Sequence, residues 1–309
     1  MRILVMGAGG VGGYFGALYA RTGHDVTFVA RGAHLAALRA NGLAIESSVA
    51  PLHLLSVSAT DDPASAGPVD VVMFCTKLWD VEAAALRVAP ALAGGGIAIP
   101  FQNGVDSHVM LQRALGAERV AGGVAQIGAV IRSPGVIAHT GTMARLQVGA
   151  FTPALAPKVA AFASAGRQAG IDIAAVDDIE RALWRKFAML AALSGVTCLA
   201  RQPVGVVRAD PDLRAAFFAA VREAVAVAGA RGIALGDDFA DRQLAFLDGL
   251  PPEMRSSMLN DLAAGNRLEA PWLSGAVARM ASEARIAAPV SATMYAAMKP
   301  YIDGANRAN

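Results

Sequence analysis

The chain opens with Met1–Arg31, MRILVMGAGGVGGYFGALYARTGHDVTFVAR, and this stretch decides the fold. Ile3–Met6 is a short apolar run, as in a buried parallel strand, and glycines follow it at G-x-G-x-x-G spacing. Small residues typical of a closely packed helix continue to Arg21, and Val26–Ala30 is a second apolar run. A strand, a glycine turn, a helix and a second strand in this order predict a Rossmann-type dinucleotide-binding domain.

The glycine turn has a physical reason at each position. The first glycine permits the tight turn, the second lets the backbone approach a pyrophosphate, and the third lets the helix pack close to the strand. The start of the helix then offers free N–H groups to the phosphates. A glycine-rich turn without a ligand is the alternative, which the flanking strands and helix disfavour. The predicted phosphate-binding residues are Gly7, Gly9, Gly10, Val11 and Gly12.

The end of the second strand indicates which dinucleotide is bound. NAD-binding proteins usually carry an acidic residue there for the ribose hydroxyls, whereas this chain has Arg31. An arginine can bind a 2′-phosphate with two hydrogen bonds, so NADP(H) is favoured over NAD. Lys77 directly follows the apolar strand Val69–Cys75 and could also touch the cofactor phosphate. A solvated surface residue is the alternative for each of these cations.

Length, charge and hydropathy limit the classes of function. The 309 residues suffice for two domains, and a net charge of +2 gives no attraction to nucleic acid or an anionic membrane. The run 88–105 contains prolines and glycines, and the run 187–200 is too short to span a bilayer. No secretory pattern precedes the first strand, so we expect a soluble cytoplasmic protein. The two cysteines match no metal spacing, and none of the five histidines has a partner that suggests catalysis or a metal site.

Further strands and a change of character divide the chain into two predicted domains. Residues 1–176 are expected to form the Rossmann domain and residues 177–309 an all-α domain, which makes the fold class α/β followed by all-α. Asn103 follows the buried strand Ile97–Pro100, at the edge where α/β sheets bind ligands. Three further strands are expected to extend the same sheet as antiparallel members: Val120–Ile131, Val136–Thr140 and Arg145–Gly149. Ile171–Val176 is expected to be a last short strand.

The helical half contains one cation in an unusual place. A helix from about Asp177 to Leu199 carries an apolar stripe, and Lys186 falls on that stripe. Its stem could pack while its ammonium reaches water, or the ammonium could be partly desolvated in a cleft. Desolvation lowers a lysine pKa and makes it a better proton donor near neutral pH. Glu269 stands just before Pro271, where it could simply complement a helix dipole. The other predicted helices are Pro211–Arg231, Phe239–Leu247, Pro252–Ala264, Pro271–Glu283 and Val290–Pro300.

Motifs along nearly the whole chain resemble those of the ketopantoate reductase (2-dehydropantoate 2-reductase) family. They are the glycine fingerprint, Thr76-Lys77, Asn103-Gly104, Leu183-Trp184-Arg185-Lys186, Ser256-Ser257-Met258-Leu259-Asn260-Asp261 and Arg267-Leu268-Glu269. The resemblance implies an NADPH-binding Rossmann domain followed by a helical domain, and a reduction of 2-dehydropantoate to pantoate in pantothenate biosynthesis. It implies that Lys186 is the general acid and that Glu269 helps to orient the substrate. It also implies that Asn103 and Ser257 hold the substrate and the nicotinamide end, and that Arg31 and Lys77 hold the 2′-phosphate.

Two positions depart from the family pattern. Well-studied members carry asparagines where this chain has Leu190 and Ser194, four and eight residues after the lysine. Both should lie on the helix face that lines the substrate site, where leucine makes the pocket more apolar. We therefore weigh reduction of a different branched 2-oxo acid as an alternative. A non-catalytic NADP(H)-binding sensor is a further alternative, which the presence of the lysine and the glutamate disfavours. The alanine- and methionine-rich helical half could bury a homodimer interface, although no pattern demands one.

Overall fold

The computed structural model describes residues 1–305, which form two compact units. The first unit contains Met1–Gln102 and Asp106–Glu180. The second contains the chain from Arg181 on, together with the three residues Asn103–Val105. Asn103, which we expected at a strand edge of the Rossmann domain, therefore belongs with the helical unit.

A parallel sheet forms the centre of the first unit, which confirms the predicted fold class. Its strand order is β5-β2-β1-β6-β7, and all its neighbours are parallel. The strands are β1 (Arg2–Met6), β2 (Asp25–Val29), β5 (Ser58–Thr60), β6 (Val71–Phe74) and β7 (Ile97–Pro100). The chain leaves β1 first to one side and later to the other, so the carboxyl end of β1 is a topological switch point. Ligands of such sheets bind there, next to the glycine turn.

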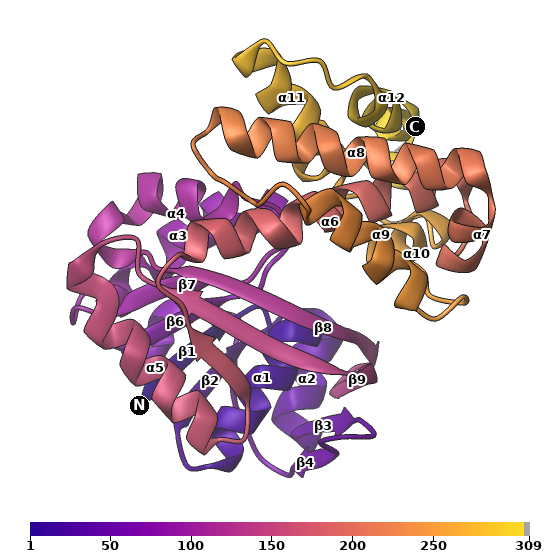
Figure 1. Ribbon diagram of the computed structural model, residues 1–309. Coiled ribbons are helices and arrows are strands. Elements are labelled where there is room, and N and C mark those ends of the chain that lie inside the picture. The colour runs from indigo at the N-terminus through magenta and orange to yellow at the C-terminus, as the bar shows by residue number, and fades with distance from the viewer. Residues whose placement is uncertain (306–309) are drawn as a thin grey trace. The chain divides into compact units, whose positions relative to one another are not determined.

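A second sheet, which the sequence analysis did not anticipate, also belongs to this unit (Figure 1). Its members are β3 (Leu43–Glu46), β4 (Leu52–Leu54), β8 (Gly122–Ser133), β9 (Val136–Gly149) and β10 (Asp172–Ala175). The prediction that the strands between Val120 and Gly149 extend the first sheet was wrong. The helix α1 (Gly10–Arg21) explains why, because it is buried almost throughout and packs against strands of both sheets. A helix with small and apolar residues on all sides needs a cover on both faces.

Strand β9 corrects a second expectation. Val136–Thr140 and Arg145–Gly149 were predicted as two strands with a turn between them, but they are one continuous strand. Gly141 takes a φ of +76° within it, and the pairing with β8 shifts register between Ile127 and Gly128. An irregularity of this kind absorbs the extra residues as a bulge instead of reversing the chain.

The remaining helices of the first unit flank its sheets. They are α2 (Gly32–Asn41), α3 (Val81–Val88), α4 (Ser107–Leu115) and α5 (Ala156–Gln168). Short 3-10 helices occupy Pro63–Ala66, Leu78–Asp80, Ala89–Leu92, Ala117–Arg119 and Pro153–Leu155. One apolar core runs through this unit and joins residues of β1, α1, β9 and α5.

Helices alone make up the second unit within the described residues, and α8 packs along α11 and α12 (Figure 1). The helices are α6 (Ile179–Ala200), α7 (Val204–Ala209), α8 (Pro211–Ala230), α9 (Phe239–Gly249), α10 (Ser257–Ala263), α11 (Ser274–Ala284) and α12 (Pro289–Met298), with 3-10 turns at Ala270–Trp272 and Lys299–Tyr301. Two predicted starts were wrong: Pro252 precedes α10 by five residues, and Pro271 lies in a 3-10 turn before α11. The α-helices begin instead at Ser257 and at Ser274. Helix α7 was not predicted.

By length and composition, α6 is the one helix among residues 1–305 that could cross a membrane. Two thirds of its apolar window, 67%, is buried inside the protein. A helix whose apolar residues already face a protein core is weak evidence for a membrane span.

Candidate functional site

The glycine turn at the end of β1 has the geometry that anion binding requires. Gly7 takes a φ of +103°, which favours glycine, and Gly9 is the N-cap of α1. No side chain caps this helix start, and its first turn contains no acidic residue. The first N–H groups of a helix have no partner within the helix, so the backbone groups of Gly10, Val11 and Gly12 suit a phosphate.

Two of these glycines are required by the packing of the protein itself, whereas a third leaves space for a ligand. A Cβ on Gly12 would come within 2.2 Å of the Gly7 carbonyl oxygen, and one on Gly10 within 2.0 Å of the Ala129 carbonyl oxygen. A Cβ on Gly9 would meet no atom within 4 Å. The open space beside Gly9 is what close approach of a pyrophosphate demands.

Two predicted cations follow the strands on either side of β1. Arg31 is the N-cap of α2 just beyond β2; it is exposed, and no carboxylate among residues 1–305 pairs with it. Lys77 lies beyond β6, with its Nζ atom 5.6 Å from the centre of the Trp79 ring. The first turn of α2 contains no acidic residue either. The uncapped start of α1, with Arg31 and Lys77 after the two neighbouring strands, fits an anionic dinucleotide.

A hydrogen bond between Gln102 and Thr76 links the ends of β7 and β6, and no role was predicted for either residue. Nε2 of Gln102 donates to Oγ1 of Thr76 at 3.5 Å. Gln102 is 7% exposed, and its Oε1 atom has no hydrogen-bond partner within the described chain. A buried acceptor without a donor is rare in proteins. The only sequence signal was its place after a buried strand, which Gln102 shares with Asn103.

In the second unit, three predicted residues come together. Nζ of Lys186 donates a hydrogen bond to Oδ1 of Asn103 at 2.9 Å. Burial lowers the pKa of the Lys186 ammonium to about 8, while the charge of the nearby Glu269 carboxylate raises it. Glu269 is itself only 6% exposed. A partly buried ammonium with a pKa near 8 is mostly protonated at neutral pH and gives up its proton more readily than an ordinary lysine.

The two positions that depart from the family pattern differ in accessibility. Leu190 and Ser194 follow Lys186 by one and two turns on the same face of α6. Leu190 is partly exposed, whereas Ser194 is completely buried. The Ser194 hydroxyl has no hydrogen-bond partner among residues 1–305. Leu190 is thus the departure that a ligand beside Lys186 can touch.

Ser257 is the exposed first residue of α10, and its buried neighbour Ser256 holds that helix in place. Oγ of Ser256 accepts a hydrogen bond from the Leu259 backbone N–H at 3.1 Å and lies 2.8 Å from Oγ1 of Thr197 on α6. Thr197 in turn donates to the Leu193 carbonyl at 2.7 Å. This chain of bonds fixes the start of α10, and with it Ser257, against α6. In the sequence, Ser256 stands out only as part of a motif, and no local pattern points to Thr197.

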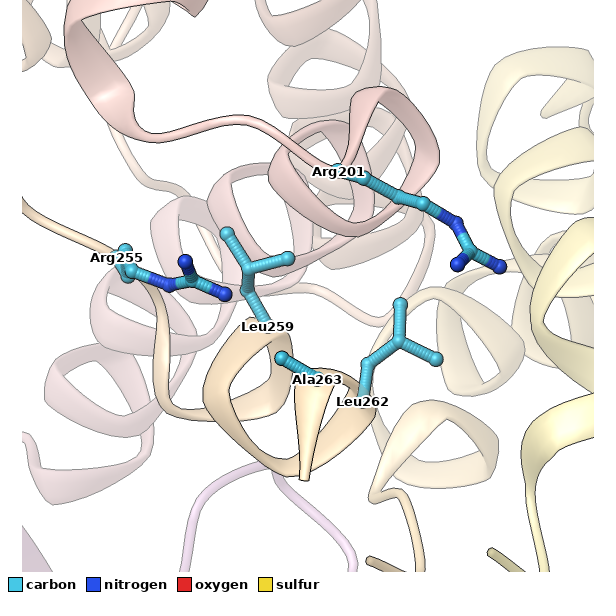
Figure 2. A pocket seen from close by; sticks show the side chains of 5 residues that line it. All are labelled: Arg201, Arg255, Leu259, Leu262 and Ala263. Atoms are coloured by element: carbon cyan, nitrogen blue, oxygen red, sulfur yellow. The ribbon is translucent and has the colours of Figure 1, made fainter. Parts of the chain in front are cut away.

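Two cavities lie away from these residues, one in each unit. One of about 140 Å³ lies between the end of α6 and α10, as Figure 2 shows, and is lined by Arg201, Arg255, Leu259, Leu262 and Ala263. Arg201 comes 15 residues after Lys186, about 20 Å away along the helix. A second cavity, of about 370 Å³, involves the Tyr14 and Arg21 side of α1 in the first unit. Neither is lined by any predicted site residue.

Known proteins match this chain over nearly its whole length. The model of the ketopantoate reductase PanE/ApbA family matches residues 3–153, and that of the family's C-terminal domain matches residues 178–301. A 2-dehydropantoate 2-reductase of Archaeoglobus fulgidus is 32% identical over 295 residues, which cover 95% of each protein.

Solved structures agree with this match. That of 2-dehydropantoate 2-reductase from Geobacter metallireducens GS-15 has a TM-score of 0.91 and 30% identity, over 97% of this chain and 99% of that one. A D-mandelate dehydrogenase with NADH and anilino(oxo)acetate has a TM-score of 0.89 at 16% identity, over 97% and 98%, which shows a shared fold. The chain therefore belongs to the ketopantoate reductase family of NAD(P)-dependent oxidoreductases.

Proposed function

We propose that this protein uses NADPH to reduce 2-dehydropantoate to pantoate, a step of pantothenate biosynthesis. The observation that carries the proposal is the Lys186 ammonium, which donates a hydrogen bond to Asn103 and interacts electrostatically with the Glu269 carboxylate. Reduction of a 2-oxo acid needs a proton for the oxygen that becomes a hydroxyl. A partly buried lysine whose pKa lies near 8 suits that task at neutral pH.

The first unit would hold the cofactor. The N–H groups at the start of α1 and the open space at Gly9 suit the pyrophosphate, and Arg31 with Lys77 suits the 2′-phosphate that distinguishes NADPH from NADH. When bound, the nicotinamide supplies the hydride. The preference for NADPH rests on Arg31, which occupies the position where NAD-binding proteins carry an acidic residue.

The second unit would supply the proton and orient the substrate. Lys186 donates its proton to the oxo oxygen and stabilises negative charge on that oxygen as it develops. Asn103 accepts from the ammonium and so holds its direction. We assign Glu269 and Ser257 to the substrate's hydroxyl and carboxylate side, because one is a buried acceptor and the other an exposed donor.

The rate should depend on pH through Lys186. The ammonium must be protonated to act as an acid, and burial places its pKa at about 8. We expect kcat/KM for reduction to be flat from pH 6 to about 7.5 and to fall about tenfold per unit well above pH 8. Oxidation of the hydroxy acid needs the neutral amine, so its rate should rise over the same range. Steady-state rates at saturating cofactor measure both profiles, and a reduction rate unchanged up to pH 10 would contradict the assignment.

A matched pair of substrates tests the proposed reaction. 3,3-Dimethyl-2-oxobutanoate has the shape of 2-dehydropantoate but lacks its hydroxyl. If a buried acceptor such as Glu269 binds that hydroxyl, kcat/KM for 2-dehydropantoate should be at least about 100-fold higher, because the analogue cannot donate that hydrogen bond. Assays run with NADPH and NADH side by side also measure the cofactor preference. Equal rates for the two acids, or a faster reaction with NADH, would contradict the proposal.

Leu190 favours a second candidate, the reduction of a more apolar branched 2-oxo acid. Its partly exposed side chain stands one turn from Lys186, where an amide would offer hydrogen bonds. In that case 3,3-dimethyl-2-oxobutanoate is the better substrate, and Leu190→Asn shifts the preference towards 2-dehydropantoate.

We also propose that the enzyme acts in the cytoplasm on a small-molecule oxo acid. The homodimer stays a prediction.

A further inference from the structure

His34 joins the two parts of the predicted cofactor site. It is the third residue of α2, three positions after Arg31, and is partly buried. Its Nε2 atom lies 2.8 Å from the carbonyl oxygen of Ala8, the residue between Gly7 and Gly9. Its Nδ1 atom accepts a hydrogen bond from the Gly135 backbone N–H at 3.1 Å, in the turn between β8 and β9.

These two bonds fix the protonation of the ring. A backbone N–H can only donate, so Nδ1 must carry a lone pair, and a carbonyl oxygen can only accept, so Nε2 must carry the proton. The neutral Nε2–H tautomer alone satisfies both partners. The ring therefore acts as a rigid bridge between two backbone segments, and a catalytic role would leave these partners unsatisfied.

Both backbone groups of Ala8 are thus held by the segment that carries Arg31. The Ala8 N–H donates to the Val29 carbonyl at 3.0 Å, and the Ala8 carbonyl accepts from His34. Ala8 itself is 3% exposed, so water offers its carbonyl little alternative. The next residue is Gly9, whose position decides how the turn meets a pyrophosphate.

We propose that His34 is a positioning residue that holds the glycine turn in register with Arg31 and thereby sets the affinity for NADP(H). This inference rests on the proposed cofactor binding and adds to it a residue that touches neither the cofactor nor the substrate. The donor bond to Ala8 carries the effect on the turn, whereas the acceptor bond to Gly135 anchors the ring from behind.

Two substitutions of His34 each keep one of its two hydrogen bonds and remove the other. Glutamine places an amide nitrogen near the position of Nε2 and keeps the donor to Ala8; asparagine places an amide oxygen near Nδ1 and keeps only the acceptor for Gly135. We expect the Kd for NADPH to rise about tenfold in His34→Asn and His34→Ala, as loss of one hydrogen bond allows, and less than about threefold in His34→Gln. The KM for the oxo acid should change less than about twofold in all three.

The experiment is a titration of NADPH fluorescence against the full-length variants, with melting temperatures measured in parallel. His53→Ala is the matched control, because His53 also bonds a backbone carbonyl, that of Asn41 at 3.3 Å, but lies on exposed β4. Equal affinities in all variants, or equal losses in the Asn and Gln variants, would overturn the role of His34. Tight NADPH binding that follows the expected order, without turnover of any oxo acid, would instead overturn the proposed function. A wild-type protein that binds no dinucleotide would overturn both.

Discussion

Lys186→Ala is expected to lower kcat for the reduction by about 10³-fold while leaving the Kd for NADPH within about twofold of the wild-type value. A positioned general acid contributes about 10² to 10⁴ in rate, and Lys186 also stabilises charge on the reacting oxygen. The predicted phosphate-binding residues belong to the other unit, and the variant changes none of them. Single-turnover mixing of the NADPH complex with substrate measures the chemical step directly.

Two further variants make the result specific. Lys186→Arg keeps a positive charge but not a proton that can be released near neutral pH, so it should remain at least about 100-fold impaired. Lys299→Ala removes a lysine of the same unit whose Nζ atom lies 5.4 Å from the centre of the Tyr295 ring, and it should retain normal turnover. Near wild-type turnover of Lys186→Ala would mean that the proton comes from another group.

Local signals in the sequence were enough for the beginning of the first sheet. The glycine spacing and the two apolar runs lie within 31 residues, so β1, α1 and β2 could be predicted together. The second sheet could not, because β3 pairs with β9 across about 90 residues of sequence. The alternation of residues in a strand shows which side is buried, but it does not name the neighbouring strand. The small and apolar residues on all sides of α1 are a sequence signal that both faces of this helix are covered.

The site shows the same difference between local and distant information. The apolar helix stripe drew attention to Lys186 but left open whether its ammonium reaches water. The pKa of about 8 follows from the desolvation that the structure adds. Ser256 and Thr197 escaped notice because their roles are hydrogen bonds between α10 and α6, which sequence spacing does not show. His34 was set aside because it has no partner side chain; both of its partners are backbone groups.

Gly9→Ala and Gly12→Ala are the same chemical change three residues apart, but they are expected to affect different properties. Gly12→Ala should lower stability, whereas Gly9→Ala should weaken cofactor binding. A Cβ on Gly12 would lie 2.2 Å from the Gly7 carbonyl oxygen and 2.7 Å from Cγ1 of Val5, so α1 must move away from β1. Overpacking of this kind costs about 1–3 kcal/mol, and more where the obstacle is backbone. We therefore expect Gly12→Ala to lower the urea midpoint clearly, even in the absence of any dinucleotide.

Gly9→Ala should leave that midpoint unchanged or slightly raised, because its Cβ meets nothing within 4 Å and its φ of −77° suits any residue. Its effect should be confined to the cofactor: the methyl group occupies the space that a pyrophosphate needs, so the Kd for NADPH should rise at least about tenfold. Urea unfolding and NADPH titration of both variants separate the two outcomes. Wild-type affinity in Gly9→Ala would mean that the phosphates do not approach the turn at this residue, and a normal midpoint in Gly12→Ala would mean that α1 and β1 can separate without loss.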